Sequence, residues 1–148
     1  MIDVPALLQD IEPTRAPGLV LFPCEATLRS GTDVSRLIVM DISFYREYGL
    51  PAPAETIAFR EVESVRVSPR RIPASIAQSI YNAEETSMGG FSIKLVFTGK
   101  RSLDYAAGGI IDFPALPVGY SMSELLSATT YPPGPKAIGS ASFEVSHI

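Results

Sequence analysis

The chain of 148 residues is poor in the side chains that most often build metal and nucleophile sites. It holds one cysteine, Cys24, and one histidine, His147. A lone cysteine excludes an intramolecular disulfide, and a zinc site of Cys and His would need ligands from another chain. His147 lies next to the chain end, where a general base lacks the fixed geometry that catalysis needs. We therefore predict no metal site, no cofactor and no nucleophile activated by histidine.

The chain also lacks the common phosphate-binding and hydrolase motifs, since Gly-x-x-x-x-Gly-Lys-Ser/Thr, Gly-x-Gly-x-x-Gly, His-Glu-x-x-His and Gly-x-Ser-x-Gly are all absent. The pairs Gly89-Gly90 and Gly108-Gly109 are too short to cradle a phosphate, and turns explain them. No apolar run approaches the ~20 residues that span a bilayer, and residues 1–3 lack the basic start of a signal peptide. We expect a soluble cytoplasmic protein with no membrane partner.

An excess of positive charge is missing as well. The net charge of -4 gives no long-range attraction for nucleic-acid phosphates or for anionic lipids, so we predict no nucleic-acid partner. The hydrophobic fraction of 46% and the charged fraction of 19% are those of a globular protein. A chain of this size buries roughly 70% of its unfolded surface, which is enough for a core of its own.

Turn residues, in contrast, are abundant, with thirteen prolines and eleven glycines, and they favour short strands over long helices. Residues 91–105 alternate apolar and polar side chains and predict a β-hairpin. We place its loop at Gly99–Arg101, which pairs Phe97 with Leu103 and puts every large side chain on one face. If the other face is open to water, the hairpin is a scaffold.

A second hairpin is predicted from Gly18 to Tyr45. The even-numbered residues of its first strand are apolar and include Cys24, which we interpret as a small core residue. Pro23 cannot donate to a ladder and indicates an edge or a bulge. Residues 55–67 predict one strand with a bulge or two short strands, because the apolar phase changes near Glu61.

Helical signals occur at three places in the chain. Asp3 can cap a first helix, in which apolar residues follow the i, i+3, i+4, i+7 spacing. Pro73 can open a second, in which Ile76, Ala77, Ile80 and Tyr81 form an apolar stripe. Ser121 and Glu124 match the Ser-x-x-Glu capping box of a third. The predicted helices cover residues 4–12, 74–85 and Met122–Ala128.

The remaining segments are short. Ile110–Phe113 predicts a buried strand, and Ala137–Val145 predicts a last strand that either lies at an edge or pairs with another subunit. Together the elements predict a β-rich α+β fold, in which antiparallel sheets of about six to seven strands form a roll or open barrel. Two to three short helices pack on it. We expect one globular domain over residues 1–130, followed by a Pro-rich connector and C-terminal segment over residues 131–148.

Two groups of side chains are candidate sites. Tyr45, Arg46 and Tyr48 lie in a segment that we predict to be a Pro-stiffened loop, and they make a candidate partner surface. The second group is a candidate anion or ligand site, of which Arg70 and Arg71 are predicted to lie near a helix start. Its members are Arg66, Arg70, Arg71, Asp104 and Tyr105.

Simpler interpretations exist for the second group. Glu61 and Glu63 can neutralise the arginines locally, and Asp104 can form an exposed ion pair with Lys94. Asp112 could instead join Asp104 as a carboxylate pair for acid–base chemistry.

Two hypotheses for function follow from these observations. The first is a non-catalytic protein-interaction or assembly module, with a protein partner or self-association. The second is a small-molecule or anion-binding domain, or a small enzyme, that uses Asp, Tyr and Arg side chains.

Overall fold

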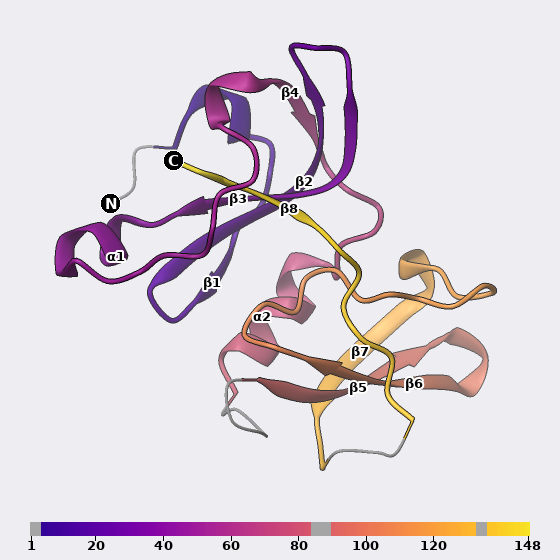
Figure 1. The fold of residues 1–148 in the computed structure, drawn as a ribbon. Helices are drawn as coiled ribbons and strands as arrows, with labels where there is room; N and C mark the ends of the chain where they lie inside the picture. Colours follow the sequence, from indigo (N-terminus) through magenta and orange to yellow (C-terminus); the bar gives the residue numbers. More distant parts are fainter. Residues whose placement is uncertain (1–3, 84–89, 133–135) are drawn as a thin grey trace. The chain divides into compact units, whose positions relative to one another are not determined.

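The computed structural model describes residues 4–83, 90–132 and 136–148 (Figure 1). They belong to two compact units, one of residues 1–68 with 143–148 and one of residues 69–142. Each unit has its own open sheet, so the protein is a β-rich α+β protein, as predicted. The strand and helix counts differ from the prediction, because the described residues form eight strands, two α-helices and four 3-10 turns. The single domain over residues 1–130 stays a prediction, which hydrogen exchange can test.

The sheet of the first unit has the order β1-β2-β3-β8, and β4 also pairs with β2. The long hairpin of β2 and β3 confirms the prediction for residues 18–45, and β8 joins β3 in parallel (Figure 1). The strands are β1 (Thr14–Ala16), β2 (Leu19–Leu28), β3 (Asp33–Asp41), β4 (Val62–Arg66) and β8 (Glu144–His147).

Pro23 lies at a gap in the pairing of β2. On one side of β2, strand β1 pairs with residues 19–21 and β4 pairs with residues 25–28, which leaves Pro23 between them. On the other side, the ladder with β3 shifts register just after Cys24. The predicted bulge is therefore present, and Pro23 sits where β1 and β4 require no donor. Cys24 forms no disulfide and is fully buried in the core, as predicted.

The N-terminal helix is shorter than predicted. Only a 3-10 turn, η1 (Ala6–Leu8), forms, although Leu8 and Ile11 are buried as the apolar spacing predicts. They pack with Phe22 and Val39 in one hydrophobic cluster. Asp3, the predicted cap, lies outside the described residues.

The predicted strand from Glu55 is wrong in its first half. A 3-10 turn, η2 (Phe59–Glu61), interrupts it, and β4 begins only at Val62. Thr56 and Ile57 instead donate their backbone N–H groups to the carbonyl of Val145, at 2.9 and 3.0 Å. The phase change in the sequence near Glu61 marks this turn.

The sheet of the second unit has the order β6-β5-β7, and helix α2 packs against β7 (Figure 1). Helix α2 confirms the predicted second helix over a shorter range, and Ala77, Ile80 and Tyr81 form its buried stripe. The elements are α2 (Ala74–Tyr81), β5 (Phe91–Phe97), η3 (Thr98–Lys100), β6 (Arg101–Ala107), η4 (Met122–Glu124) and β7 (Leu125–Thr130).

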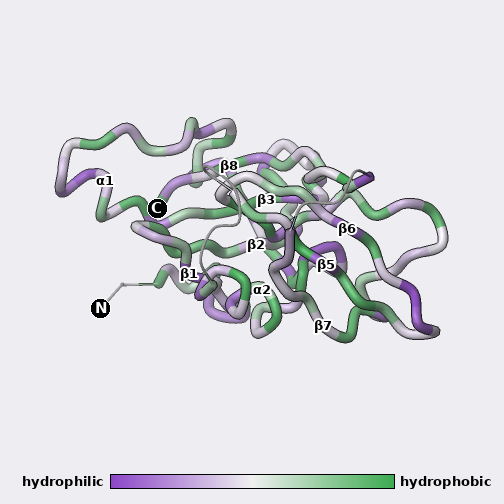
Figure 2. Tube along the Cα trace, turned by 90° about the horizontal axis from the view of Figure 1, so that it is seen from below, coloured by the Kyte–Doolittle hydropathy of each residue, from purple (hydrophilic) through white to green (hydrophobic). Residues whose placement is uncertain are grey.

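The β5–β6 hairpin forms, but its predicted register is wrong. Phe97 pairs with Arg101 and Leu95 with Leu103, so the three-residue loop is Thr98–Lys100. Gly99 and Lys100 both take positive φ, at 74° and 60°, and the chain therefore reverses one residue earlier than predicted. The shift moves the pairing by two residues, so the large side chains still share one face. That alternation is visible along β5 in Figure 2.

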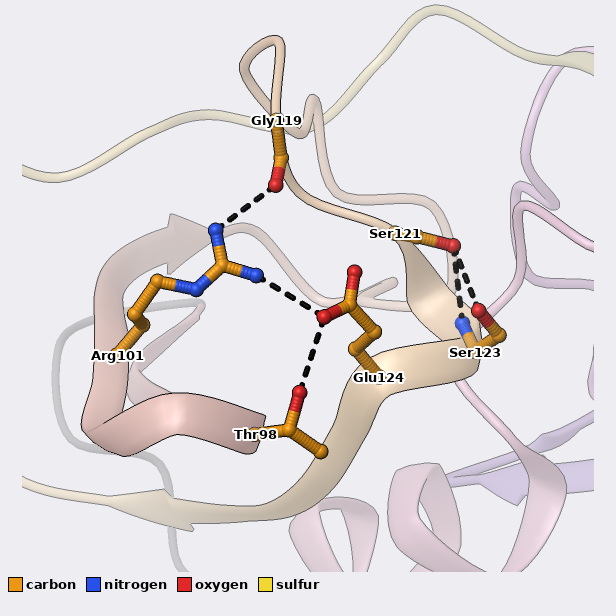
Figure 3. A network of polar contacts seen from close by, with 6 residues as sticks. All are labelled: Thr98, Arg101, Gly119, Ser121, Ser123 and Glu124. Carbon is orange, nitrogen blue, oxygen red and sulfur yellow. Dashed lines mark hydrogen bonds and ion pairs between the residues drawn. The ribbon is translucent and has the colours of Figure 1, made fainter.

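The third predicted helix is wrong. Ser121 does cap a turn, since its Oγ accepts the N–H of Ser123 at 3.3 Å, but the turn η4 ends at Glu124. Glu124 does not complete the capping box, because its carboxylate binds Arg101 at 3.1 Å and Thr98 at 2.9 Å (Figure 3). The residues that follow pair with β5 as strand β7.

The last two predicted strands are also corrected. Ile111 and Phe113 are buried, as expected, but residues 110–113 form no strand. Ile138 makes an isolated parallel bridge to Tyr105 of β6, and the named strand β8 begins only at Glu144. In the part of the chain that the structure describes, no helix has the length and apolar character to cross a membrane.

Candidate functional site

Helix α1 (Ser43–Tyr48) occupies part of the segment that the sequence predicts to be a loop. Its end is a Schellman motif, because Gly49 takes φ 64° and Leu50 N–H donates to the carbonyl of Tyr45 at 2.9 Å. At its start, the buried carboxylate of Asp41 accepts the backbone N–H of Ser43 at 2.8 Å. The signal for this helix that the sequence analysis missed was Gly49, because glycine is common at the position just after a helix ends.

This short helix carries an exposed cluster of large side chains. The side chains of Phe44, Tyr48 and Leu50 are 46%, 62% and 47% exposed. The ring of Phe44 lies 4.8 Å from that of Tyr48 and 5.7 Å from that of Tyr45, centroid to centroid. We call Phe44, Tyr45, Tyr48 and Leu50 the α1 aromatic surface. Helix α1 lies at one end of the first unit, beyond the strands (Figures 1 and 2).

The α1 aromatic surface is held in place by the chain around it. Phe44 packs on Gly18, where an added Cβ would lie 2.9 Å from the Phe44 ring. Arg46 donates to the carbonyl of Ile148 at 3.0 Å. Beyond the helix, His147 contacts the carbonyl of Pro53 through Nε2 at 2.7 Å. His147, predicted to be a poorly fixed chain end, lies in β8 and fastens this segment.

The three residues predicted as a partner surface therefore have different environments. Tyr48 is exposed, Tyr45 is half-buried beside Phe44, and Arg46 is exposed but bonded to the C-terminal residue. Phe44 and Leu50, which the sequence analysis did not select, complete the surface. Phe44 was not selected because it continues the apolar alternation of the preceding strand.

The residues of the predicted anion site are divided between the two units. Arg66 belongs to the first unit, where it donates to Thr27 at 3.0 Å and lies 3.8 Å from the carboxylate of Asp33. The other four belong to the second unit. There Arg71 is buried and its Nε donates to the carbonyl of Ile72 at 3.3 Å, whereas Arg70 is exposed.

Asp104 and Tyr105 are neighbours in β6 and so point to opposite faces of the strand. Asp104 is half-buried opposite Lys94, which is exposed, and the hairpin face that they share is largely open to water. Tyr105 is 1% exposed. Asp104 and Asp112 do not form the carboxylate pair considered above, because Asp112 is fully buried and bonded to Tyr81 whereas Asp104 is half-buried on the open hairpin face.

A buried polar network joins Tyr81, Tyr105 and Asp112. The Tyr81 hydroxyl donates to the Asp112 carboxylate and accepts the backbone N–H of Ile111 at 2.9 Å. The Tyr105 hydroxyl donates to the carbonyl of Ile111 at 2.9 Å and lies 2.9 Å from Ser140 Oγ.

Burial raises the pKa of both phenols, and for Tyr81 the nearby Asp112 carboxylate raises the pKa further. Both hydroxyls therefore stay protonated at neutral pH. The network joins Ile111 and Asp112 to Tyr81 of helix α2, and Ile111 and Ser140 to Tyr105 of strand β6.

The described residues contain no group of three or more His, Cys, Asp or Glu side chains that could hold a metal ion. Comparison with known proteins gives no further assignment, since no protein-family model, no curated protein and no solved structure matches the chain. A function must therefore be inferred from the side chains themselves, and the α1 aromatic surface and the buried polar network are the two features to consider.

Proposed function

We propose that this protein is a non-catalytic protein-interaction module and that the α1 aromatic surface is its contact site. The proposal rests on one observation: Phe44, Tyr48 and Leu50 are exposed together on and just after helix α1, whose C-terminal end is fixed by a Schellman motif. Burial of large apolar and aromatic side chains against a partner removes apolar surface from water and so stabilises the complex. Aromatic residues are also the ones enriched among the residues that dominate binding energy at interfaces.

The fixed geometry of this surface supports the same proposal. Packing on Gly18 and the Schellman motif hold the rings in one arrangement, so little conformational entropy is lost when a partner binds. Tyr48 offers a hydroxyl beside its ring, which suits a partner that presents an apolar patch with a hydrogen-bond acceptor.

The alternative function is a small-molecule or anion-binding domain, or a small enzyme, built from Asp, Tyr and Arg. Its five candidate residues lie in two different units, and Tyr105 is buried. Arg70 and Asp104 are the members with exposed or half-exposed side chains in the second unit. This function remains the weaker proposal, and no cofactor is proposed for it.

Photo-crosslinking inside cells tests the first proposal. A photoreactive phenylalanine analogue replaces Tyr48 in one variant and Val118, which is fully exposed in the second unit, in a matched control. We expect a discrete protein adduct from position 48 and none from position 118. A second substitution, Leu50→Ser, should reduce the adduct at position 48 by ~10-fold or more, as the loss of an interface anchor does.

Two results would contradict the proposal. One is the absence of a discrete adduct from position 48 while the variant remains folded. The other is an adduct of the same mass and yield from both positions, which would indicate non-specific collision.

A further inference from the structure

The edges of both sheets differ in how they are protected from pairing with other chains. Beside β8, Thr56 and Ile57 donate to the carbonyl of Val145 and cover that edge. Beside β6, Ile138 exchanges backbone bonds with Asp104 and Ala106, at 2.8 and 2.9 Å. Two of the edges are thus covered by the chain itself.

The edge formed by β1 and β4 is protected by charge and by shortness. Strand β4 carries the exposed side chains of Glu63 and Arg66, and β1 is only three residues long and includes Arg15. Charged side chains and short strands are the usual means by which proteins discourage edge pairing.

Among the described residues, no segment covers the outer edge of strand β7 and no charged side chain lies on it; its one irregularity is a bulge at Leu126, which leaves residues 127–130 as a regular edge. Its sequence, Leu-Leu-Ser-Ala-Thr-Thr, has no charge and no proline, and its tube in Figure 2 has no strongly hydrophilic colour. Leu126 is 61% exposed, whereas Leu125 and Ala128 are the buried side chains of the strand. The order β6-β5-β7 places β7 at the edge of its sheet.

In the part of the chain that the structure describes, the backbone of β7 also has hydrogen-bonding groups that no other strand uses. Tyr131 N–H donates to the carbonyl of Ser92, and in an antiparallel ladder such bonds recur at every second residue. Ser127 and Thr129 therefore bond toward β5, and the N–H and C=O groups of Ala128 and Thr130 point to the opposite side. Within the described ranges, no strand pairs with that side.

We propose that β7 pairs with β7 of a second copy of this chain, in antiparallel register, to join two three-stranded sheets into one. The outward-facing backbone of Ala128 then lies opposite its own copy, and Thr130 lies beside the bulge at Leu126 of the partner. Ser127 faces Thr129 of the partner, so no like charges meet. A second copy is favoured as the occupant because this uncharged strand is complementary to itself. The inference concerns β7 alone and is independent of the α1 aromatic surface.

Solution mass tests this proposal with designed charges. The exposed residues Ser127 and Thr129 are changed together in two variants, S127E/T129E and S127K/T129K. The wild-type chain should sediment at twice its mass of 15.9 kDa, and each variant alone should sediment as a monomer because like charges now face each other. An equimolar mixture of the two variants should restore a dimer, now a heterodimer. The control S64K, on β4, should leave the wild-type dimer unchanged.

A second measurement needs no substitution and so does not depend on the variants folding. The amides of Ala128 and Thr130 should exchange more slowly as the protein concentration rises, whereas the exchange of Ser127 and Thr129, already bonded to β5, should change little. A wild-type chain that is monomeric at every concentration overturns the proposal. This holds even if a different protein pairs with β7, because the proposed partner is a second copy of this chain. A dimer that persists in both charged variants overturns it as well.

Discussion

Tyr81 is the side chain on which the buried polar groups of the second unit converge. Its hydroxyl is bonded both to the Asp112 carboxylate and to the Ile111 amide, deep in the unit. The sequence placed Tyr81 on the buried face of a helix, and the structure confirms this burial. It could not reveal the partner, because Asp112 lies 31 residues further along the chain.

Replacing Tyr81 with phenylalanine should destabilise the protein by about 1–3 kcal/mol, since two buried polar groups each lose a partner. Chemical denaturation followed by circular dichroism measures the change. Tyr48→Phe removes the same hydroxyl from an exposed ring and should alter stability by less than about 0.5 kcal/mol. Equal effects of the two substitutions would show that the buried bonds contribute nothing.

The raised pKa of Tyr81 and Tyr105 predicts a loss of stability at alkaline pH. Above pH ~10 the phenols of the unfolded chain release protons while the buried ones retain theirs. The unfolded state then binds fewer protons, so the free energy of unfolding falls as pH rises, by about 1.4 kcal/mol per pH unit for each phenol. Below that pH the stabilisation is fully present.

Unfolding free energies measured between pH 8 and about pH 11 test the prediction, with tyrosinate absorbance as the second readout. Tyr81→Phe should reduce the alkaline slope of the free energy of unfolding. A slope that is the same with and without the Tyr81 hydroxyl would mean that burial does not raise the pKa of this phenol.

At the scale of elements, the segment from Ser121 to Thr130 shows how one local signal can fit two structures. A capping box requires the N3 glutamate to return to the N-terminal backbone, but Glu124 is drawn to Arg101 across the hairpin (Figure 3). Arg101 also donates to the Gly119 carbonyl at 2.8 Å and stacks 4.5 Å above the Tyr120 ring. These partners are distant in sequence, so a local motif could not reveal them.

The start of β5 depends on a close backbone approach at Gly90. A Cβ at this position would lie 2.3 Å from the carbonyl oxygen of Ala107, whereas one at Gly109 would meet no atom within 4 Å. Gly90→Ala should therefore separate the strand ends and cost about 1–3 kcal/mol. Gly109→Ala, where φ is not left-handed, should cost less than about 0.5 kcal/mol.

Thermal unfolding of the two alanine variants measures this difference. If Gly90→Ala proves as stable as Gly109→Ala, the β5 and β6 ends are not in contact at this point.

At the scale of the whole molecule, the C-terminal residues complete the first unit although they follow the second in sequence. Val145 is buried in β8, its carbonyl accepts Thr56 and Ile57, and Ile148 accepts Arg46. Deleting residues 143–148 should lower hydrogen-exchange protection in β2 and β3 and leave protection in β5 and β6 unchanged, because foldons open separately.

Amide exchange followed by mass spectrometry on the truncated and full chains provides the measurement, with β5 and β6 as the internal control. A uniform loss of protection in both units would instead show one cooperative domain, as predicted for residues 1–130.

Much of the β-rich character could be predicted, because alternation depends only on neighbouring residues. The hairpins, the buried Cys24 and the stripe of α2 follow from period and composition alone. The α1 aromatic surface was found in part, through Tyr45 and Tyr48. Phe44 was not selected, because it continues the apolar alternation of β3 although helix α1 already begins at Ser43.

The sequence by itself determined which residues are apolar, that two hairpins form, and which face of helix α2 is buried. Only the tertiary structure decided that Glu124 pairs with Arg101, that Leu125–Thr130 is a strand, and that the C-terminal residues return to β3. The physical reason is the range of the interactions. Periodicity and turn chemistry act over a few residues, whereas ladders and buried hydrogen bonds join residues that only folding brings together.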